Sequence, residues 1–295
     1  MVDAFKQLLL FLLSWAFDSF NDSIDTAIKV LEDSGGFDIL SNASALSSNF
    51  APVCSTVLGI CVLAELAIYS THVDTLRWEH GVKIGTKIAL AKVFCDNAPA
   101  LMSAIYLQSQ AWTKDMKLSV VESATSKSIS QKIMQNFDKI MQGVSGLGNA
   151  VGLFLTLIIV VLAIAACGLL IKVMAYGRIF EIFAYAIISP IPCAFMPLTG
   201  TTEFGINNIT KKFFKSFIAV CLQGVIMVVC LRVYNALMCG AINTVITNLG
   251  DVDTILAEDK IAYVSDMLWA MAMGSIALVV AVSKSSSWAK SMIDG

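Results

Sequence analysis

Cysteine and histidine are the side chains that most often carry chemistry. In this sequence they have few neighbours with which they could form a disulfide, a metal site or a catalytic group. The chain has eight cysteines and two histidines. No two cysteines form a Cys-x-x-Cys pair, and all eight lie in apolar stretches, where a thiol behaves as a small hydrophobic group. The histidines, His72 and His80, have no neighbouring set of metal-binding residue types. We therefore expect no metal site, no disulfide framework and no bound cofactor.

Motifs of catalysis are also missing from the sequence. It contains no Gly-x-Ser-x-Gly elbow, no His-Glu-x-x-His zinc motif and no Walker A phosphate loop. Two histidines near a predicted membrane boundary offer little material for a catalytic triad or dyad. We therefore predict that the protein is not an enzyme and has no catalytic residue.

Polar side chains inside long apolar segments are the residues that can do chemistry here. The set comprises Glu65, Lys92, Asp96, Glu181, Arg232, Asn235 and Asp266. Such groups are costly in lipid and normally face a bundle interior or a water-filled path. They could line or gate a pore. For each residue taken alone we favour structural pairing between helices. Example pairs are Glu65 or Glu181 with Lys92 or Arg232, and Lys92 with Asp96 at a spacing of four.

Three prolines mark a break in one apolar segment, residues 179–198. Ser189 precedes Pro190 and Pro192, and Pro197 follows. Proline removes a backbone donor and clashes with the preceding helical turn. Broken backbone is tolerated at membrane depth only where protein or water covers it. This segment is therefore expected to be a kinked span or a re-entrant hairpin, a feature that lines substrate paths in transporters.

The elements that position these residues are membrane spans. The chain is 57% hydrophobic and 14% charged, whereas soluble domains are about 25% charged. A helix needs about 20 apolar residues to cross a bilayer. Segments of this kind are 50–71, 82–107, 149–171, 213–238 and 261–283. The predicted fold class is all-α: a polytopic α-helical membrane protein with about five transmembrane helices plus the proline-broken or re-entrant helix.

Two further helices are expected to be amphipathic. Residues 1–33 have apolar positions at helical spacing but an acidic second half, which favours an interfacial or partner-facing helix. A second helix lies in the polar region 108–146 and is expected outside the bilayer. Its apolar stripe consists of Ile129, Ile133, Phe137, Ile140 and Val144. Each stripe could dock a partner or pack back on the bundle.

These segments suggest an organisation in four parts. An N-terminal exterior or interfacial segment (1–49) precedes a first transmembrane helix pair (50–107). An exterior amphipathic loop (108–146) then leads to a C-terminal transmembrane bundle (147–295). Basic residues collect on the cytoplasmic side of membranes. If segment 179–198 re-enters, that rule places the N-terminus outside and the C-terminus in the cytoplasm, in a multi-pass protein of the cytoplasmic membrane.

The order of these features resembles a known family. An acidic leading helix precedes two spans, an exterior amphipathic loop, a strong span and a short turn from Lys172 to Arg178. The next segment contains Ala186-Ile-Ile-Ser-Pro190. This layout is similar to that of the TrbL-like polytopic inner-membrane subunits of type IV secretion, or conjugal transfer, systems. The stretch from Arg178 to Pro190 carries the local likeness.

The resemblance implies a non-enzymatic channel or scaffold subunit. Several copies would form a homo-oligomer around the path of a transferred DNA strand or protein, with energy from separate ATPase subunits. The exterior helices would dock other subunits of the secretion machine. The main alternative is a small-solute transporter or permease that uses the broken helix and the charges as its site. Internal repeats would favour that alternative, and none is evident. A stand-alone pore is a third possibility.

Overall fold

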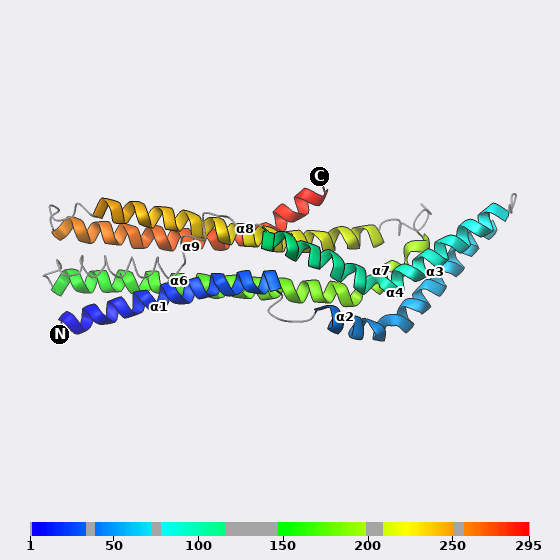
Figure 1. The fold of residues 1–295 in the computed structure, drawn as a ribbon, viewed down its shortest axis with the longest axis horizontal. Coiled ribbons are helices and arrows are strands. Elements are labelled where there is room, and N and C mark those ends of the chain that lie inside the picture. Colours follow the sequence, from blue (N-terminus) through cyan, green and yellow to red (C-terminus); the bar gives the residue numbers. More distant parts are fainter. Residues whose placement is uncertain are drawn as a thin grey trace. The chain divides into compact units, whose positions relative to one another are not determined.

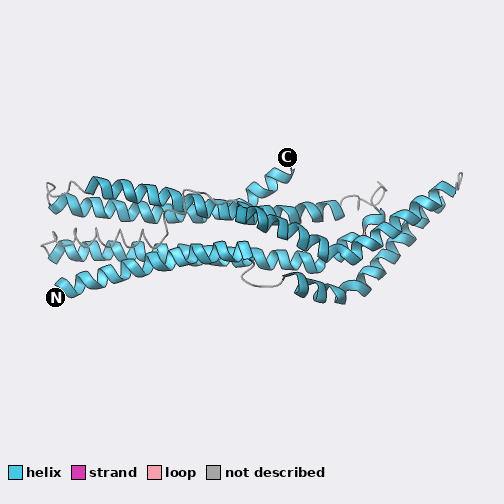
Figure 2. Ribbon diagram, viewed as in Figure 1, coloured by secondary structure: helices cyan, strands magenta, loops and turns pink. Residues whose placement is uncertain are grey.

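The protein is helical throughout the residues that the structure, a computed structural model, describes: 2–33, 39–71, 78–115, 147–198, 209–249 and 257–294 (Figures 1 and 2). The long helices are α1 (Val2–Asp33), α3 (Ala51–Thr71), α4 (Trp78–Asp115), α6 (Leu147–Ile188), α8 (Ile209–Leu249) and α9 (Ala257–Asp294). Short helical pieces are α2 (Ile39–Ser47), η2 (Ser48–Phe50), α7 (Pro190–Ala194) and η4 (Met196–Leu198). No strand occurs in these ranges, so the all-α prediction is confirmed. The predicted stripe from Ile129 to Val144 lies outside the described residues.

Five segments of the described chain are long and apolar enough to cross a membrane. They are Ala45–Ile68, Ile84–Asp115, Phe154–Ala194, Ile209–Met238 and Leu268–Ile293. Each overlaps one of the five predicted spans, which confirms a multi-pass membrane protein. The third segment also takes in most of the proline-containing region, because it extends to Ala194.

The predicted turn from Lys172 to Arg178 is wrong. Helix α6 continues through this stretch and spans 42 residues, a length of about 63 Å at 1.5 Å per residue. The only helix-weakening residue in the stretch is Gly177, and one glycine costs a helix only about 1 kcal/mol. Both cations have carboxylate partners, Lys172 with Asp22 and Arg178 with Glu181. The apolar span and the first part of the proline segment are therefore one helix.

Contacts between Cα atoms divide the chain into two compact units, each assembled from segments far apart in sequence. Unit 1 consists of Met1–Glu32, Thr113–Tyr176 and Val225–Ser285. Unit 2 consists of Asp33–Trp112, Gly177–Gly224 and Ser286–Gly295. Helices α6, α8 and α9 are divided between the units, and α1 and α4 cross the boundary at their last residues.

In unit 1, the apolar stripe of α1 packs on helices of the same chain. Its buried members are Leu13, Phe17, Phe20, Ile24 and Leu31. The Phe20 ring meets the Tyr234 ring of α8 edge-on, with centroids 5.8 Å apart. On α6, a Cβ at Gly168 would lie only 2.9 Å from Ser23 Oγ, so the glycine permits a close approach of α1 (Figure 1). The chain itself therefore covers this stripe.

Candidate functional site

The helix break is at Ser189, between α6 and α7, in unit 2. The Ser189 side chain is fully buried, and its hydroxyl donates to the carbonyl of Ala186 at 2.8 Å. Pro190 opens α7, a position where its missing N–H would have no helical partner in any case. The Phe195 N–H donates to the Pro192 carbonyl at 3.3 Å, and Pro197 is buried in η4. The prolines thus end a long helix and start a short one.

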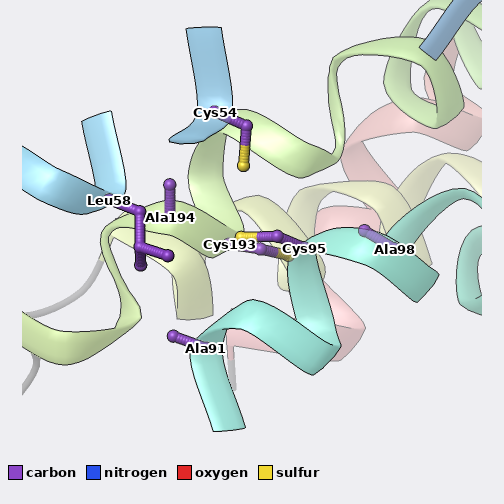
Figure 3. Packing of buried hydrophobic residues seen from close by; sticks show 7 residues of the cluster. All are labelled: Cys54, Leu58, Ala91, Cys95, Ala98, Cys193 and Ala194. Carbon is purple, nitrogen blue, oxygen red and sulfur yellow. The ribbon is translucent and has the colours of Figure 1, made fainter. Parts of the chain in front are cut away.

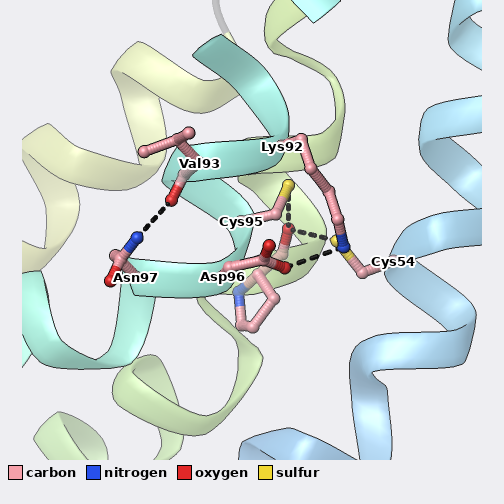
Figure 4. Close-up of polar contacts among 7 residues, drawn as sticks. Cys54, Lys92, Val93, Cys95, Asp96 and Asn97 are labelled. Atoms are coloured by element: carbon pink, nitrogen blue, oxygen red, sulfur yellow. Dashed lines mark hydrogen bonds and ion pairs between the residues drawn. The ribbon is translucent and has the colours of Figure 1, made fainter. Parts of the chain in front are cut away.

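Side chains from other helices satisfy the carbonyl groups at the break. The Pro190 carbonyl accepts hydrogen bonds from the thiols of Cys54 on α3, at 3.3 Å, and Cys95 on α4, at 3.6 Å (Figure 4). The Pro192 carbonyl accepts one from the Thr210 hydroxyl on α8, at 2.7 Å. Such donors let irregular backbone persist where water is scarce. The sequence predicts both thiols only as small hydrophobic groups, because nothing in it relates them to a carbonyl at position 190.

Small buried residues surround the break and bring three helices close together. The cluster comprises Cys54, Leu58, Ala91, Cys95, Ala98, Cys193 and Ala194, from α3, α4 and α7 (Figure 3). Short side chains allow membrane helices to approach closely and gain packing contacts. In the described part of the chain no group of three or more histidine, cysteine or acidic residues is placed to hold a metal ion. In this structure the Cys54 and Cys95 thiols donate to the Pro190 carbonyl, and Cys193 packs in the buried cluster.

An exposed ion pair lies beside this cluster. Lys92 Nζ and Asp96 Oδ1 of α4 are 2.8 Å apart, and their side chains are 51% and 55% exposed. Asn97 is also exposed, and its amide donates to the Val93 carbonyl at 2.8 Å (Figure 4). A cavity of about 300 Å³ connects the pair with the break. Its lining is Ser47, Ser48, Ala51, Cys54, Lys92, Cys95, Asp96, Pro99, Ala100 and Pro190. The structure thus brings predicted polar and break residues into one site.

Glu65 forms a second pair within the α3–α4 hairpin. Its side chain is fully buried, and Oε1 accepts a hydrogen bond from Lys87 Nζ at 2.8 Å. Oε2 of Glu65 has no partner among the described residues. Pairing of Glu65 with Lys92 was therefore a wrong prediction. Lys92 lies five residues beyond Lys87, more than one helical turn, and it bonds Asp96 instead.

The remaining predicted pairings are also corrected. Glu181 pairs with Arg178, three residues earlier on α6, and not with Lys92 or Arg232. Arg232 on α8 pairs with Glu32 near the end of α1, in unit 1. The Arg232 and Glu32 side chains are 14% and 19% exposed. The acidic half of α1 thus supplies the partner that a deep arginine requires.

Asn235 and Asp266 are the remaining predicted polar residues. Asn235 is half-buried on α8, three residues beyond Arg232, and Asp266 is exposed on α9. Both belong to unit 1, whereas the break and its cavity belong to unit 2. Neither residue is in the lining of the cavity at the break.

Another ion pair, which the sequence pattern does not predict, joins α1 to α6. Lys172 Nζ lies 2.8 Å from Asp22 Oδ2. The hydrogen bond and the charge of Lys172 lower the pKa of Asp22, and Lys29 adds to this effect. The two residues therefore share one depth relative to the membrane. Residues 1–33 cannot all lie outside the membrane while Lys172 lies in the cytoplasm, because the ion pair links Asp22 to Lys172.

Comparison with known proteins points to one family. The sequence model described as TrbL/VirB6 plasmid conjugal transfer like protein matches residues 22–190. This region is more than half of the chain and runs from Asp22 in α1 to Pro190 at the helix break. No curated protein and no solved structure matches the chain significantly.

Proposed function

The chain belongs to the TrbL/VirB6 plasmid conjugal transfer-like family, and on that premise we propose that it is a channel or scaffold subunit. Membership makes it a membrane component of a conjugal transfer system that works with other subunits. In the proposal, several copies form a homo-oligomer around the translocation path of DNA or protein. The subunit is not an enzyme, and separate ATPases supply the energy.

The exposed Lys92–Asp96 pair carries this proposal. Both side chains are more than half exposed, yet they lie within the apolar span Ile84–Asp115. A lysine or aspartate at the centre of a membrane helix costs about 2.5–3.5 kcal/mol by insertion scales. Lipid is therefore a poor environment for this face of α4. A second subunit or a water-filled path would shelter it, as an oligomer around a conduit provides.

Conjugative transfer tests the role of the pair. We expect a Lys92→Leu/Asp96→Leu variant to accumulate in the membrane at normal levels. Its transfer frequency should fall by about tenfold or more. A loss of about 1.4 kcal/mol in the interaction free energy along the path already corresponds to a factor of ten. Lys114→Leu is the matched control, an exposed lysine in the last turn of the same helix. Normal transfer by the double variant would contradict a conduit role for this face.

Thiol labelling distinguishes a wet environment from lipid. A charged, water-soluble thiol reagent should modify an Asp96→Cys variant in native membranes. It should not modify Leu63→Cys, a control on the apolar span of α3 whose leucine is 68% exposed. Equal reactivity at both positions would argue against a sheltered aqueous face. The small-solute transporter would be favoured if native mass spectrometry showed only the monomer and the Lys92→Leu/Asp96→Leu variant transferred normally.

The proposed orientation has the N-terminus outside and the C-terminus in the cytoplasm of the cytoplasmic membrane. The five candidate spans each cross the membrane once, which takes the chain from an exterior N-terminus to a cytoplasmic C-terminus. Helix α1 adds no crossing in this topology, so Asp22 reaches Lys172 from the exterior side. Enzyme reporters fused after Lys290 and before Val2 test both ends. An external signal from the C-terminal fusion would refute the topology.

A further inference from the structure

A second cavity, of about 370 Å³, lies in unit 2 between the start of α8 and the end of α9. It is lined by Lys212, Lys215, Ser216, Ala219, Lys290 and Ile293. These described lining residues carry three positive charges and no negative charge. We propose that the cavity binds the phosphate headgroup of an anionic phospholipid. The proposal does not depend on the channel role.

The two helices hold the lysines in a fixed arrangement. Lys215 Nζ donates to the backbone carbonyl of Ile293 at 3.3 Å, which ties the last turn of α9 to α8. Lys212 lies three residues before Lys215, so both project from one side of α8. Lys212, Ser216 and Lys290 are exposed. Two ammonium groups and a hydroxyl are therefore open to an incoming anion beside a third, anchored lysine.

The position along the helices places the cavity at a membrane surface. The α8 span begins at Ile209 and the α9 span ends at Ile293, so both spans reach their boundary here. Trp288, 43% exposed, lies two residues before Lys290, and exposed tryptophan is typical of the membrane–water interface. Basic pockets between transmembrane helices at that level bind lipid headgroups.

Apolar surface next to the cavity suits the rest of a lipid. Ile209 and Ile218 of α8 are 40% and 42% exposed. Ala219 and Ile293 contribute apolar surface to the cavity itself. A phospholipid offers both a phosphodiester and acyl chains. A nucleic acid strand shares the phosphodiester but is bound through an extended series of cations, whereas this site groups three lysines around one small cavity.

Lipid titration followed by native mass spectrometry tests the proposal on the full chain in detergent. Phosphatidylglycerol should bind in preference to phosphatidylcholine. In a Lys212→Gln/Lys215→Gln/Lys290→Gln variant its affinity should fall on the order of a hundredfold, at roughly fivefold for each lysine. Lys290→Gln should show one such step, and Lys290→Arg should retain binding. Far-UV circular dichroism and elution volume establish that each variant is folded.

The matched control removes two lysines from the same helices but outside the cavity. Lys211 and Lys284 are both exposed, and a Lys211→Gln/Lys284→Gln variant should keep the wild-type affinity. Equal loss in this control would overturn the site, because it would show only general surface attraction. Equal binding of phosphatidylcholine would also overturn it. So would lysine-dependent binding of a single-stranded oligonucleotide without any preference for phosphatidylglycerol. If the triple variant does not fold, the comparison of Lys290→Gln with Lys290→Arg decides.

Discussion

Removing Lys87 should expose the cost of a buried, unpaired carboxylate. Glu65 is fully buried, and its only described hydrogen bond comes from Lys87 at 2.8 Å. We therefore expect Lys87→Met to destabilise the protein much more than Glu65→Leu does. The lysine side chain is 28% exposed, so without its partner it can reach water along its flexible stem. The carboxylate has no such route.

The magnitudes follow from burial. Breaking a buried ion pair by removing one partner costs about 3–5 kcal/mol. Because water reaches part of Lys87, we take the lower end, about 3 kcal/mol, for Lys87→Met. Glu65→Leu should cost about 1 kcal/mol, the loss of one net hydrogen bond. The double variant should lie within about 1 kcal/mol of wild type, since apolar side chains replace the whole pair.

Reversible unfolding in mixed micelles with increasing sodium dodecyl sulfate provides the assay, with far-UV circular dichroism as the readout. The four proteins form a double-mutant cycle, and the expected coupling energy between Glu65 and Lys87 is about 3–5 kcal/mol, the summed cost of the single variants less that of the double variant. Lys92→Met is the matched control on the same helix. Both partners of the Lys92–Asp96 pair are more than half exposed, and such pairs contribute about 0–1 kcal/mol.

Two results would refute this reasoning. One is a Lys87→Met variant as stable as the double variant, which would mean that the lone carboxylate is not penalised. The other is a coupling energy no larger than the effect of Lys92→Met. Either result would show that water reaches Glu65 and that its burial does not govern its energetics.

Two further predictions concern the docking of α1 in unit 1. Gly168→Ala should destabilise the protein by about 1–3 kcal/mol through overpacking, because the new Cβ would lie 2.9 Å from Ser23 Oγ. Adding Ser23→Gly to this variant should restore most of the lost stability. The control in the same unfolding assay is Gly152→Ala, since a Cβ at Gly152 would have nothing within 4 Å. The pKa of Asp22 is lowered by Lys172, so its stabilising effect is present above the ordinary aspartate value of about 4 and disappears as pH falls through the lowered pKa. Unfolding from pH 7 to pH 2 should therefore show wild type and Asp22→Asn converging in acid, and a constant difference would contradict the role of this pair.

Local sequence patterns predicted the helices and the break well. Apolar runs of membrane-spanning length identified the five spans, since the bilayer imposes that length on any crossing helix. Two closely spaced prolines in one apolar segment predicted the break, because each removes a backbone donor and crowds the preceding helical turn. The four-residue spacing of Lys92 and Asp96 allowed their pairing on one helix, and they do pair. These properties depend on residues close together along the chain.

Contacts between distant segments could not be predicted in this way. Lys172 and Arg178 looked like the end of a span, but α6 continues through both. The partner of Lys172, Asp22, comes from the distant helix α1, whereas Arg178 pairs locally with Glu181. Arg232 required a partner, yet the choice of Glu32, 200 residues away, depends on how α1 packs. The thiol donors to the Pro190 carbonyl likewise come from two other helices.

The sequence by itself determined that this is an all-helical, multi-pass membrane protein with one proline break, because hydropathy and backbone chemistry act over a few turns of helix. Only the tertiary structure decided which carboxylate meets which cation, which carbonyl at the break is satisfied by which side chain, and which lysines gather in one cavity. Those choices depend on helix register and packing, and hydropathy does not encode them because many registers bury the same apolar faces.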